Sequence, residues 1–389
     1  MDRKGGPMAR TFAQDRARGI VAVLVASMLL TAGVAAAQPS SRETGPPGSV
    51  VRVEALPRQW WLPGAAAGSV VTYRTTGPRG VPALSTGAVF VPPGAAPAGG
   101  WPVLSWGHGA VGIADRCAPT VDGRIDNGYL AHWLSEGYAI VATDYVGLGT
   151  PGVHAYLDGP SEAHALIDMV RAARTVEPSL GPRWAALGQS QGGQAVMVAA
   201  SLATRYAPEL DYRGAVALGV PSNIEHLVPF GDPAFPPLPL TGTAVFIAYL
   251  LAGMRATYPD VEVDRFLSPR GRDVLARLEN LCYREAAAEF PDLSIGELLA
   301  RRTDDPALAR AARDMLEIPT RGYDRPLFLG QGLTDTVTPA PFTVKLVADL
   351  TAAGTRFVFR PYPAGHLETM RASLSDATAF VRELFASEG

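Results

Sequence analysis

The chain has 389 residues, of which 47% are hydrophobic and 18% are charged, and its formal net charge is −3. This composition is typical of a globular protein with a sizeable core, and it excludes an intrinsically disordered chain. Because binding to phosphates needs a concentrated basic face, we expect no nucleic-acid partner.

The N-terminus has the layout of a secretory signal peptide. Arginines precede a mostly apolar run over residues 20–34, and three alanines ending at Ala37 supply the small residues of a cleavage site. The alternative is a membrane anchor, but the run is shorter than the ~20 apolar residues that span a bilayer. We therefore predict a signal peptide over residues 1–37 and a secreted protein. Whether translation starts at Met1 or Met8 stays open.

The next segment, residues 38–58, is rich in Pro, Ser and Gly and predicts a flexible start of the mature protein. Apolar strands and helices then alternate as far as residue 223. The expected strands are Ser69–Thr75, Ala83–Val91, Val103–Trp106, Tyr138–Asp144, Trp184–Leu187 and Gly214–Leu218. The expected helices are Gly128–Glu136, Ser161–Val176 with Ser161 as its N-cap, and Gln191–Tyr206. This alternation is typical of a mostly parallel sheet covered by helices on both faces.

The rhythm of strands and helices stops between residues 224 and 320, where helical patterns occur without a clear strand. It resumes with strands at Pro326–Gly330 and Arg356–Arg360 and a final helix from about Ser373 to Ala386. The sequence therefore predicts an α/β core over residues 59–223 and 321–389, interrupted after its sixth strand by a helical cap over residues 224–320.

The motif that carries chemistry is Gly188-Gln189-Ser190-Gln191-Gly192, which matches Gly-x-Ser-x-Gly between an apolar strand and a helix. A sharp strand-to-helix turn exposes the serine hydroxyl above the sheet, and side chains at the two flanking positions would collide across it. Gly188 and Gly192 meet that requirement. The alternative is a chance match in a Gly-rich chain, but the strand and helix are placed correctly. We predict that Ser190 is a nucleophile.

A serine nucleophile needs a histidine base and an acid to orient that base, in the chain order Ser, acid, His. Only His226 and His366 follow Ser190. His366 follows the last predicted strand, whereas His226 lies at the entrance of the cap, so we favour His366. The acid should follow the preceding strand, as Asp335 does; Asp324 lies at the wrong end of that strand. The remaining alternative is that Asp335 only makes a turn.

Two N–H groups must bind the oxyanion. We assign one to Gln191, directly after the nucleophile, and the other to Ala110, in the loop after the strand Val103–Trp106. Residues 147–152 also match Gly-x-Gly-x-x-Gly, but Pro151 and a following loop replace the helix that a dinucleotide site needs, so we expect no nucleotide cofactor. No spacing of His or carboxylate residues predicts a metal site.

The apolar stretch Ala244–Met254 is too short to span a membrane. It is either a buried core helix or a lid or acyl-chain groove over the nucleophile. On the second interpretation Phe246 and Leu250, together with Tyr145, are candidates for a substrate pocket.

The two cysteines, Cys117 and Cys282, are a candidate disulfide, because an even pair in an exported chain favours oxidation. Closing so long a loop stabilises by roughly 4–5 kcal/mol on the chain-entropy model. The alternative is two unrelated buried thiols.

Several segments together resemble the secretory lipase family of the α/β-hydrolase superfamily. They are Trp106-Gly107-His108-Gly109, Asp144-Tyr145-Val146-Gly147-Leu148-Gly149, Gly188–Gly193, Asp335, His366 and the cysteine pair. The resemblance covers roughly residues 55–385 and implies an extracellular lipase or esterase with a cap between the sixth and seventh strands. The fungal members carry a long C-terminal flap, whereas this chain ends soon after His366, so interfacial activation and long-chain specificity do not follow from the resemblance.

The sequence as a whole predicts a hydrolase that cleaves carboxylic esters through an acyl-enzyme on Ser190, without a cofactor. We expect a small-molecule or lipid ester as substrate and transient contact with lipid interfaces. An amidase, a peptidase or an acyltransferase with the same triad stays open, as does a non-catalytic binding protein. The oligomeric state, the acyl length and the physiological substrate are not predicted.

Overall fold

The computed structural model describes residues 45–123, 126–236 and 242–386. The predicted signal peptide and its cleavage site after Ala37 lie outside these residues. Within them, no helix combines the length and apolar character needed to cross a membrane.

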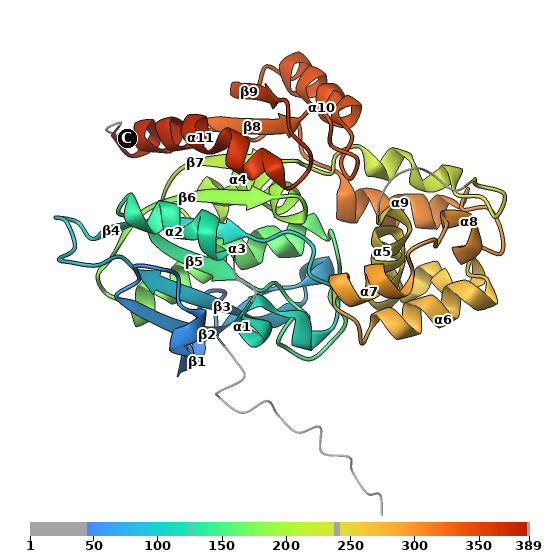
Figure 1. The fold of residues 1–389 in the computed structure, drawn as a ribbon, viewed down its shortest axis with the longest axis horizontal. Helices are drawn as coiled ribbons and strands as arrows, with labels where there is room; N and C mark the ends of the chain where they lie inside the picture. The colour runs from blue at the N-terminus through green and yellow to red at the C-terminus, as the bar shows by residue number, and fades with distance from the viewer. Residues whose placement is uncertain (1–44, 124–125, 237–241, 387–389) are drawn as a thin grey trace, which may run out of the picture. The chain divides into compact units, whose positions relative to one another are not determined.

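A single nine-stranded sheet forms the centre of the protein, in the order β1-β2-β3-β5-β4-β6-β7-β8-β9 (Figure 1). The strands are β1 Val50–Ala55, β2 Ala67–Thr76, β3 Pro82–Val91, β4 Trp101–Gly107, β5 Ala139–Thr143, β6 Leu180–Gln189, β7 Asp211–Leu218, β8 Leu327–Gly332 and β9 Phe357–Tyr362. The pairings from β5 to β9 are parallel, and those among β1, β2, β3 and β5 are antiparallel. The prediction of a mostly parallel sheet is confirmed.

The first strand was not predicted. Residues 50–55 were assigned to a flexible segment, but they form β1, which pairs antiparallel with β2 at the edge of the sheet. Their Val-Val-Arg-Val-Glu-Ala sequence is short and mostly exposed, so its strand character comes from backbone pairing and not from burial. With β1 counted, the cap follows the seventh strand and not the sixth.

Helices cover both faces of the sheet. Helices α3 (Gly159–Val176), α4 (Gln191–Tyr206) and α10 (Ala340–Ala352) pack against one face, and α2 (Asn127–Ser135) and α11 (Glu368–Ala386) against the other. Successive strand residues such as Val103 and Leu104 enter opposite cores, as the alternation of side chains along a strand requires. The predicted arrangement of layers is therefore confirmed.

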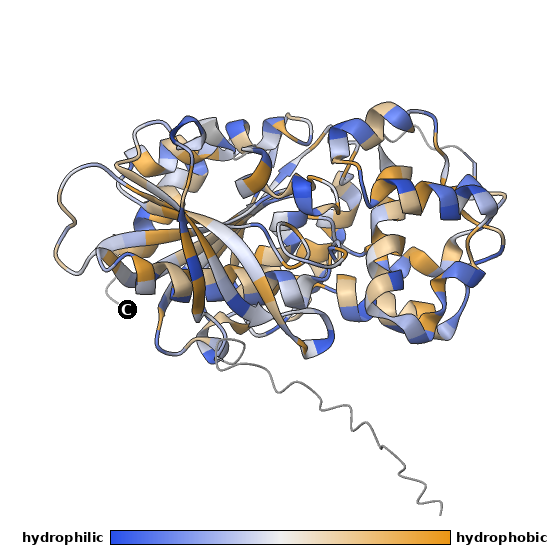
Figure 2. Ribbon diagram, turned by 90° about the horizontal axis from the view of Figure 1, so that it is seen from below, coloured by the Kyte–Doolittle hydropathy of each residue, from blue (hydrophilic) through white to orange (hydrophobic). Residues whose placement is uncertain are grey.

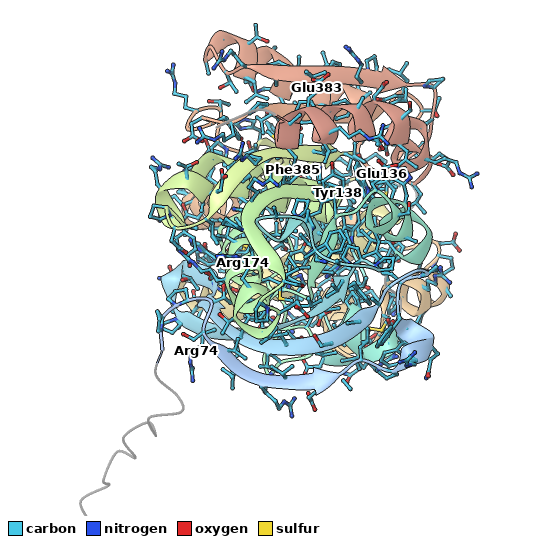
Figure 3. The ribbon with its side chains drawn as sticks, turned by 90° about the vertical axis from the view of Figure 1, so that its left-hand side faces the viewer. Arg74, Glu136, Tyr138, Arg174, Glu383 and Phe385 are labelled. Carbon is cyan, nitrogen blue, oxygen red and sulfur yellow. A yellow bond between two sulfur atoms is a disulfide. The ribbon has the colours of Figure 1, made fainter. Side chains whose placement is uncertain are left out.

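The packing of α11 against the end of α2 is visible in Figure 3, where Tyr138 and Phe385 lie close together with their ring centroids 5.2 Å apart. One local prediction was wrong: Ser161 does not cap α3. The helix starts two residues earlier, and the carboxylate of Asp158 accepts a hydrogen bond from the Ser161 N–H at 3.0 Å. An aspartate at this position competes well with serine for an N-cap.

Between β7 and β8, the described residues form helices and no strand. After the short turns Ile224–His226 and Val228–Phe230, the helices are α5 (Thr243–Thr257), α6 (Pro269–Leu278), α7 (Tyr283–Glu289), α8 (Ile295–Leu298) and α9 (Pro306–Leu316). They gather beyond one end of the sheet (Figure 1) and share a hydrophobic core of their own. Apolar residues occur in the helices of this cap as well as in the strands of the sheet (Figure 2).

A disulfide joins the cap to the loop that follows β4. Cys117 lies just before helix α1 (Pro119–Asp122), Cys282 is the N-cap residue of α7, and the two sulfurs are bonded. The bond closes a loop of 165 residues. The α/β core and the cap are therefore tied together covalently close to the loop that contains Ala110.

Candidate active site

Ser190 occupies a strained turn between β6 and α4. Its backbone has φ 58° and ψ −123°, a conformation that residues other than glycine rarely adopt. A Cβ on Gly188 would lie 2.2 Å from the Gly192 carbonyl oxygen, as expected for a collision across the turn. A Cβ on Gly192 would instead lie 1.9 Å from the carbonyl oxygen of Gly107, at the end of β4. Both glycines are thus required, the second because a neighbouring strand approaches so closely.

The three residues assigned to a triad lie within hydrogen-bonding distance of one another. His366 Nε2 is 2.8 Å from Ser190 Oγ, and His366 Nδ1 is 2.7 Å from Asp335 Oδ2. The loops after β6, β8 and β9 bring them together, because parallel strands end at the same edge of the sheet. The arrangement allows the imidazole to accept the serine proton while the carboxylate holds its Nδ1–H.

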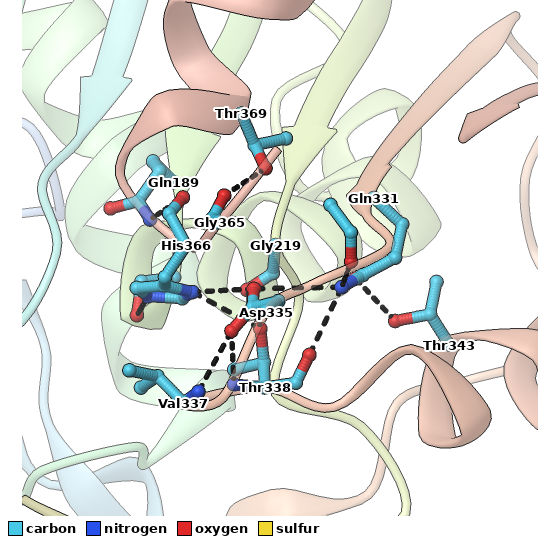
Figure 4. Close-up of polar contacts among 12 residues, drawn as sticks. Gln189, Gly219, Gln331, Asp335, Val337, Thr338, Thr343, Gly365, His366 and Thr369 are labelled. Atoms are coloured by element: carbon cyan, nitrogen blue, oxygen red, sulfur yellow. Dashed lines mark hydrogen bonds and ion pairs between the residues drawn. The ribbon is translucent and has the colours of Figure 1, made fainter. Parts of the chain in front are cut away.

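Asp335 is held by donors on both of its oxygens (Figure 4). Oδ1 accepts the N–H groups of Val337 and Thr338, each at 2.8 Å, and Oδ2 accepts the Thr338 hydroxyl at 2.7 Å besides His366. Burial alone would raise the pKa of Asp335, but the hydrogen bond and charge of His366 and the bonds from Thr338 lower it below its usual value. The carboxylate therefore stays ionised and accepts hydrogen bonds only.

Thr338 was not singled out from the sequence. Besides binding Asp335, its hydroxyl lies 3.2 Å from His366 Nδ1 and 3.2 Å from the carbonyl oxygen of Gly219. The available signal was its position three residues after Asp335, where a hydroxyl reaches back to an Asx-type turn.

The two rival residues lie away from this cluster. The side chain of His226 is 60% exposed and contacts Glu225. Asp324 precedes β8 and accepts a hydrogen bond from Thr204 at 3.0 Å.

The groups assigned to the oxyanion hole lie on either side of Ser190. Gln191 is the first residue of α4, where a helix offers its N–H no acceptor of its own. The loop after β4 passes next to Ser190, since a Cβ on Gly109 would be 3.5 Å from Ser190 Cβ, and Ala110 follows directly. The ring nitrogens of His108 in this loop lie 2.7 Å from the carbonyl oxygen of Gly109 and 3.3 Å from that of Asp144. Burial lowers the pKa of His108 and so favours the neutral ring, which carries one N–H and donates to only one of these oxygens.

The assignment of Tyr145 to the substrate pocket was wrong. Tyr145 is fully buried, and its hydroxyl donates to the carbonyl oxygen of His108 at 3.2 Å. Its backbone has φ 70°, and its side chain belongs to the core that α3 and α4 share with the sheet. Phe246 and Leu250, by contrast, do line a cavity at Ser190.

That cavity has a volume of about 300 Å³ and runs from Ser190 into the cap. One face of α5 lines it, and so do segments after β7 and β8 that sequence patterns did not identify. Besides Ser190, the lining residues with a polar side-chain group are Tyr156, Ser222, Thr243, Thr303 and Thr338, and no charged residue belongs to it among the residues described. The stretch Ala244–Met254 therefore fits both interpretations offered for it: most of it is buried, and it also borders the cavity.

The glycine-rich segment over residues 147–152 does not open a helix, since α3 begins only at Gly159. Gly147 has φ 81°, and a Cβ there would lie 2.7 Å from the backbone of His154. Its glycines thus allow a tight fold of the chain onto itself. In the part of the chain that the structure describes, no cluster of three His, Cys, Asp or Glu residues could hold a metal ion.

Comparison with known proteins gives mainly lipases and esterases. The chain is 25% identical over 376 residues to Lipase A of Moesziomyces aphidis, which covers 89% of this chain and 78% of that protein. It is 26% identical over 279 residues to a secreted triacylglycerol lipase of Malassezia furfur, of which it spans only 54%. The structure of Candida antarctica lipase A superposes with a TM-score of 0.74 at 22% identity, over 89% of this chain and 84% of that one.

The likeness to the solved structure confirms the α/β-hydrolase fold predicted from the sequence. The model of the secretory lipase family matches residues 116–388, which is most of the chain and includes Ser190, Asp335 and His366. Lipase and esterase activity is the activity of this family and of these relatives. The protein belongs to the secretory lipase family.

Proposed function

We propose that the protein hydrolyses carboxylic esters with apolar acyl chains, using Ser190 as nucleophile, His366 as general base and Asp335 as the residue that orients His366. The observation that carries the proposal is the continuous set of hydrogen bonds from Ser190 Oγ through the His366 ring to Asp335. It lies at the mouth of an uncharged apolar cavity. An elbow, a base, an orienting acid and an adjacent cavity are the parts that ester hydrolysis by a serine needs.

In the first step Ser190 Oγ attacks the ester carbonyl carbon, and its proton passes to His366 Nε2. The tetrahedral oxyanion accepts hydrogen bonds from the N–H groups of Gln191 and Ala110, and a positive helix end at Gln191 adds to its stabilisation. The C–O bond to the alcohol then breaks, and His366 gives its proton to the leaving oxygen. Water attacks the acyl-enzyme, again losing a proton to His366, which returns it to Ser190 as the carboxylic acid leaves.

The acyl chain lies in the cavity along α5. From Phe246 to Met254 the lining of this helix spans about 12 Å at 1.5 Å per residue, enough for a chain longer than acetate. An apolar chain gains free energy by leaving water, whereas a charged peptide side chain would find no partner in this lining. The lining therefore favours an ester of a fatty acid over a peptide.

The first test is hydrolysis of p-nitrophenyl esters from acetate to palmitate by the purified mature protein, with Ser190→Ala in parallel. We expect activity that Ser190→Ala abolishes, and a preference for acyl chains longer than acetate. A Ser190→Ala protein with undiminished activity would falsify the scheme. Hydrolysis of the matched amides would indicate an amidase, and transfer of the acyl group to added alcohols would indicate an acyltransferase. Failure of the protein to react with a fluorophosphonate would point to a non-catalytic binding protein.

Contact with lipid aggregates occurs at the rim of the same cavity. Leu227 and Phe230 are 47% and 66% exposed, and both also belong to the cavity lining. Exposed apolar side chains continuous with an acyl-binding cavity suit the surface of an aggregated ester. Phe230→Ser should lower activity on emulsified triacylglycerol but not on a water-soluble ester; equal activity on both would contradict this contact.

The protein is exported through cleavage of residues 1–37. The disulfide between Cys117 and Cys282 agrees with export, because such bonds persist in oxidising compartments. N-terminal sequencing of the protein from culture medium should begin at Gln38, and a start upstream of it would refute the assigned cleavage position.

A further inference from the structure

The side chain of Gln191 takes part in a buried polar cluster. It is 1% exposed, and its Nε2 lies 2.7 Å from Glu162 Oε1 and 2.7 Å from His154 Nε2. Glu162 Oε1 also accepts the N–H of Leu157 at 3.0 Å, and His154 Nδ1 lies 2.8 Å from the carbonyl oxygen of Val146. The residue that supplies the proposed oxyanion donor is thus anchored by side chains from two other segments.

Burial disfavours charge in this cluster. Burial raises the pKa of Glu162 well above its usual value and lowers the pKa of His154 to about 4. The contact of 3.6 Å between Glu162 and His154 is therefore not an ion pair. With its Nδ1–H donated to Val146, neutral His154 offers Nε2 as an acceptor. Each N–H of the Gln191 amide then has one acceptor, which defines the orientation of that side chain.

The same cluster reaches the second proposed oxyanion donor. The ring of His154 stacks on that of Tyr145, with centroids 5.9 Å apart and planes inclined by 9°. The Tyr145 hydroxyl donates to the carbonyl oxygen of His108, two residues before Ala110. Gly147 allows this arrangement, because any Cβ there would collide with the backbone of His154. The glycine-rich segment thus brings one buried cluster against both sides of the nucleophile.

We propose that Glu162 and His154 are positioning residues, which hold Gln191 so that its backbone N–H points at the oxyanion. The proposal rests on the proposed function. A backbone in a sparsely populated conformation, such as that of Ser190, persists only where its surroundings hold it. Both amide hydrogen bonds of Gln191 act on the residue next to this strained one. These two bonds therefore set the direction of the Gln191 backbone N–H, which binds the oxyanion only in the transition state.

The test compares two glutamines of the same helix. Gln191→Met keeps the backbone N–H but removes both anchoring bonds. Gln194→Met is the matched control: Gln194 is equally buried, and its Nε2 bonds the carbonyl oxygens of Leu157, Met315 and Leu316 at 3.1–3.3 Å. We expect Gln191→Met to lower kcat roughly 10–100-fold, which is no more than the removal of one oxyanion donor costs. The KM should stay within about twofold of the native value.

Binding of a boronic acid that mimics the tetrahedral intermediate should weaken in Gln191→Met by the same factor as kcat. Gln194→Met should lower Tm at least as much while kcat stays within about threefold, since a purely structural role moves stability and not the transition state. The proposal is overturned if Gln191→Met keeps the kcat of the native protein, or if Gln194→Met loses as much kcat.

A second pair of variants tests the positioning role of Glu162 even if Gln191→Met does not fold. Glu162→Gln keeps an oxygen that accepts the Gln191 amide and should retain kcat within about threefold, whereas Glu162→Met should lose it as Gln191→Met does. Equal kcat in the two Glu162 variants overturns the positioning role. A Ser190→Ala protein that stays active instead refutes the proposed function, so the two failures are distinguishable.

Discussion

The replacement Asp335→Asn tests the orientation of His366 with almost no change of shape. Oδ1 of Asp335 accepts two backbone N–H groups, from Val337 and Thr338. An asparagine must therefore keep its carbonyl oxygen at that position, because its NH₂ group only donates and cannot accept hydrogen bonds from these two N–H groups. The NH₂ group then takes the place of Oδ2, 2.7 Å from His366 Nδ1, and donates to it.

Such a bond forces the proton of His366 onto Nε2, the atom that faces Ser190 at 2.8 Å. A protonated Nε2 cannot accept the serine proton, so the base is lost although every side chain stays in place. The equivalent change in the chymotrypsin-type triad costs about 10⁴-fold in kcat. We expect a loss of the same order here, or about 5.4 kcal/mol at 1.36 kcal/mol per factor of ten.

The assay is the rate of p-nitrophenyl ester hydrolysis at pH 7, with the rate of fluorophosphonate labelling as a second readout. Asp324→Asn is the matched control, since Asp324 lies before β8 and its side chain bonds only Thr204 among the contacts described. This variant should have a kcat within twofold of the native value. A kcat for Asp335→Asn within tenfold of the native value would refute the argument from tautomers. If the melting temperature of Asp335→Asn is close to that of the native protein, the loss of kcat is not caused by misfolding.

Three further predictions concern stability and specificity. The double change Cys117→Ser and Cys282→Ser opens a loop of 165 residues. It should lower the Tm measured by calorimetry by roughly 5–10 °C. An unchanged Tm would mean that the two cysteines are reduced in the native protein. Leu250→Trp should fill the cavity and lower kcat/KM for long acyl esters roughly tenfold or more while sparing acetate; an equal loss on both would argue against an acyl site. Because the pKa of Asp335 is lowered in the folded state, its contribution to stability is present above its unfolded pKa and disappears as pH falls through the folded one. Denaturant unfolding should thus give the native protein a larger free energy of unfolding than Asp335→Asn at pH 7 and an equal one in strong acid. A difference in unfolding free energy that does not change with pH would contradict this prediction.

The sequence was informative wherever one residue's chemistry depends on its neighbours along the chain. The elbow around Ser190 needs glycines at two defined offsets and a strand and helix on its flanks, and all of these are local features. Helix α4 has the bounds that its sequence predicted, Gln191–Tyr206. His366 and Asp335 followed from the order of the chain and the ends of two apolar strands.

Predictions that depend on which side chains meet across the fold were less successful. Tyr145 follows a strand at the edge where the site forms, yet its ring is fully buried in the core. Residues 50–55 look like a linker because they bury little, and only the exposed edge of β2 makes them a strand. Ser161 and Asp158 are both good caps, and the start of the helix decided between them.

The sequence by itself determined the class of fold and indicated a candidate nucleophile with its candidate partners, because strand and helix periodicity and the elbow act over short stretches of chain. The tertiary structure alone decided what surrounds them. The cavity is lined by segments up to 186 residues apart, from Tyr156 to Phe342, and the anchoring of Gln191 joins a loop, α3 and α4. Such contacts depend on close packing between distant segments, which no local pattern of residues encodes.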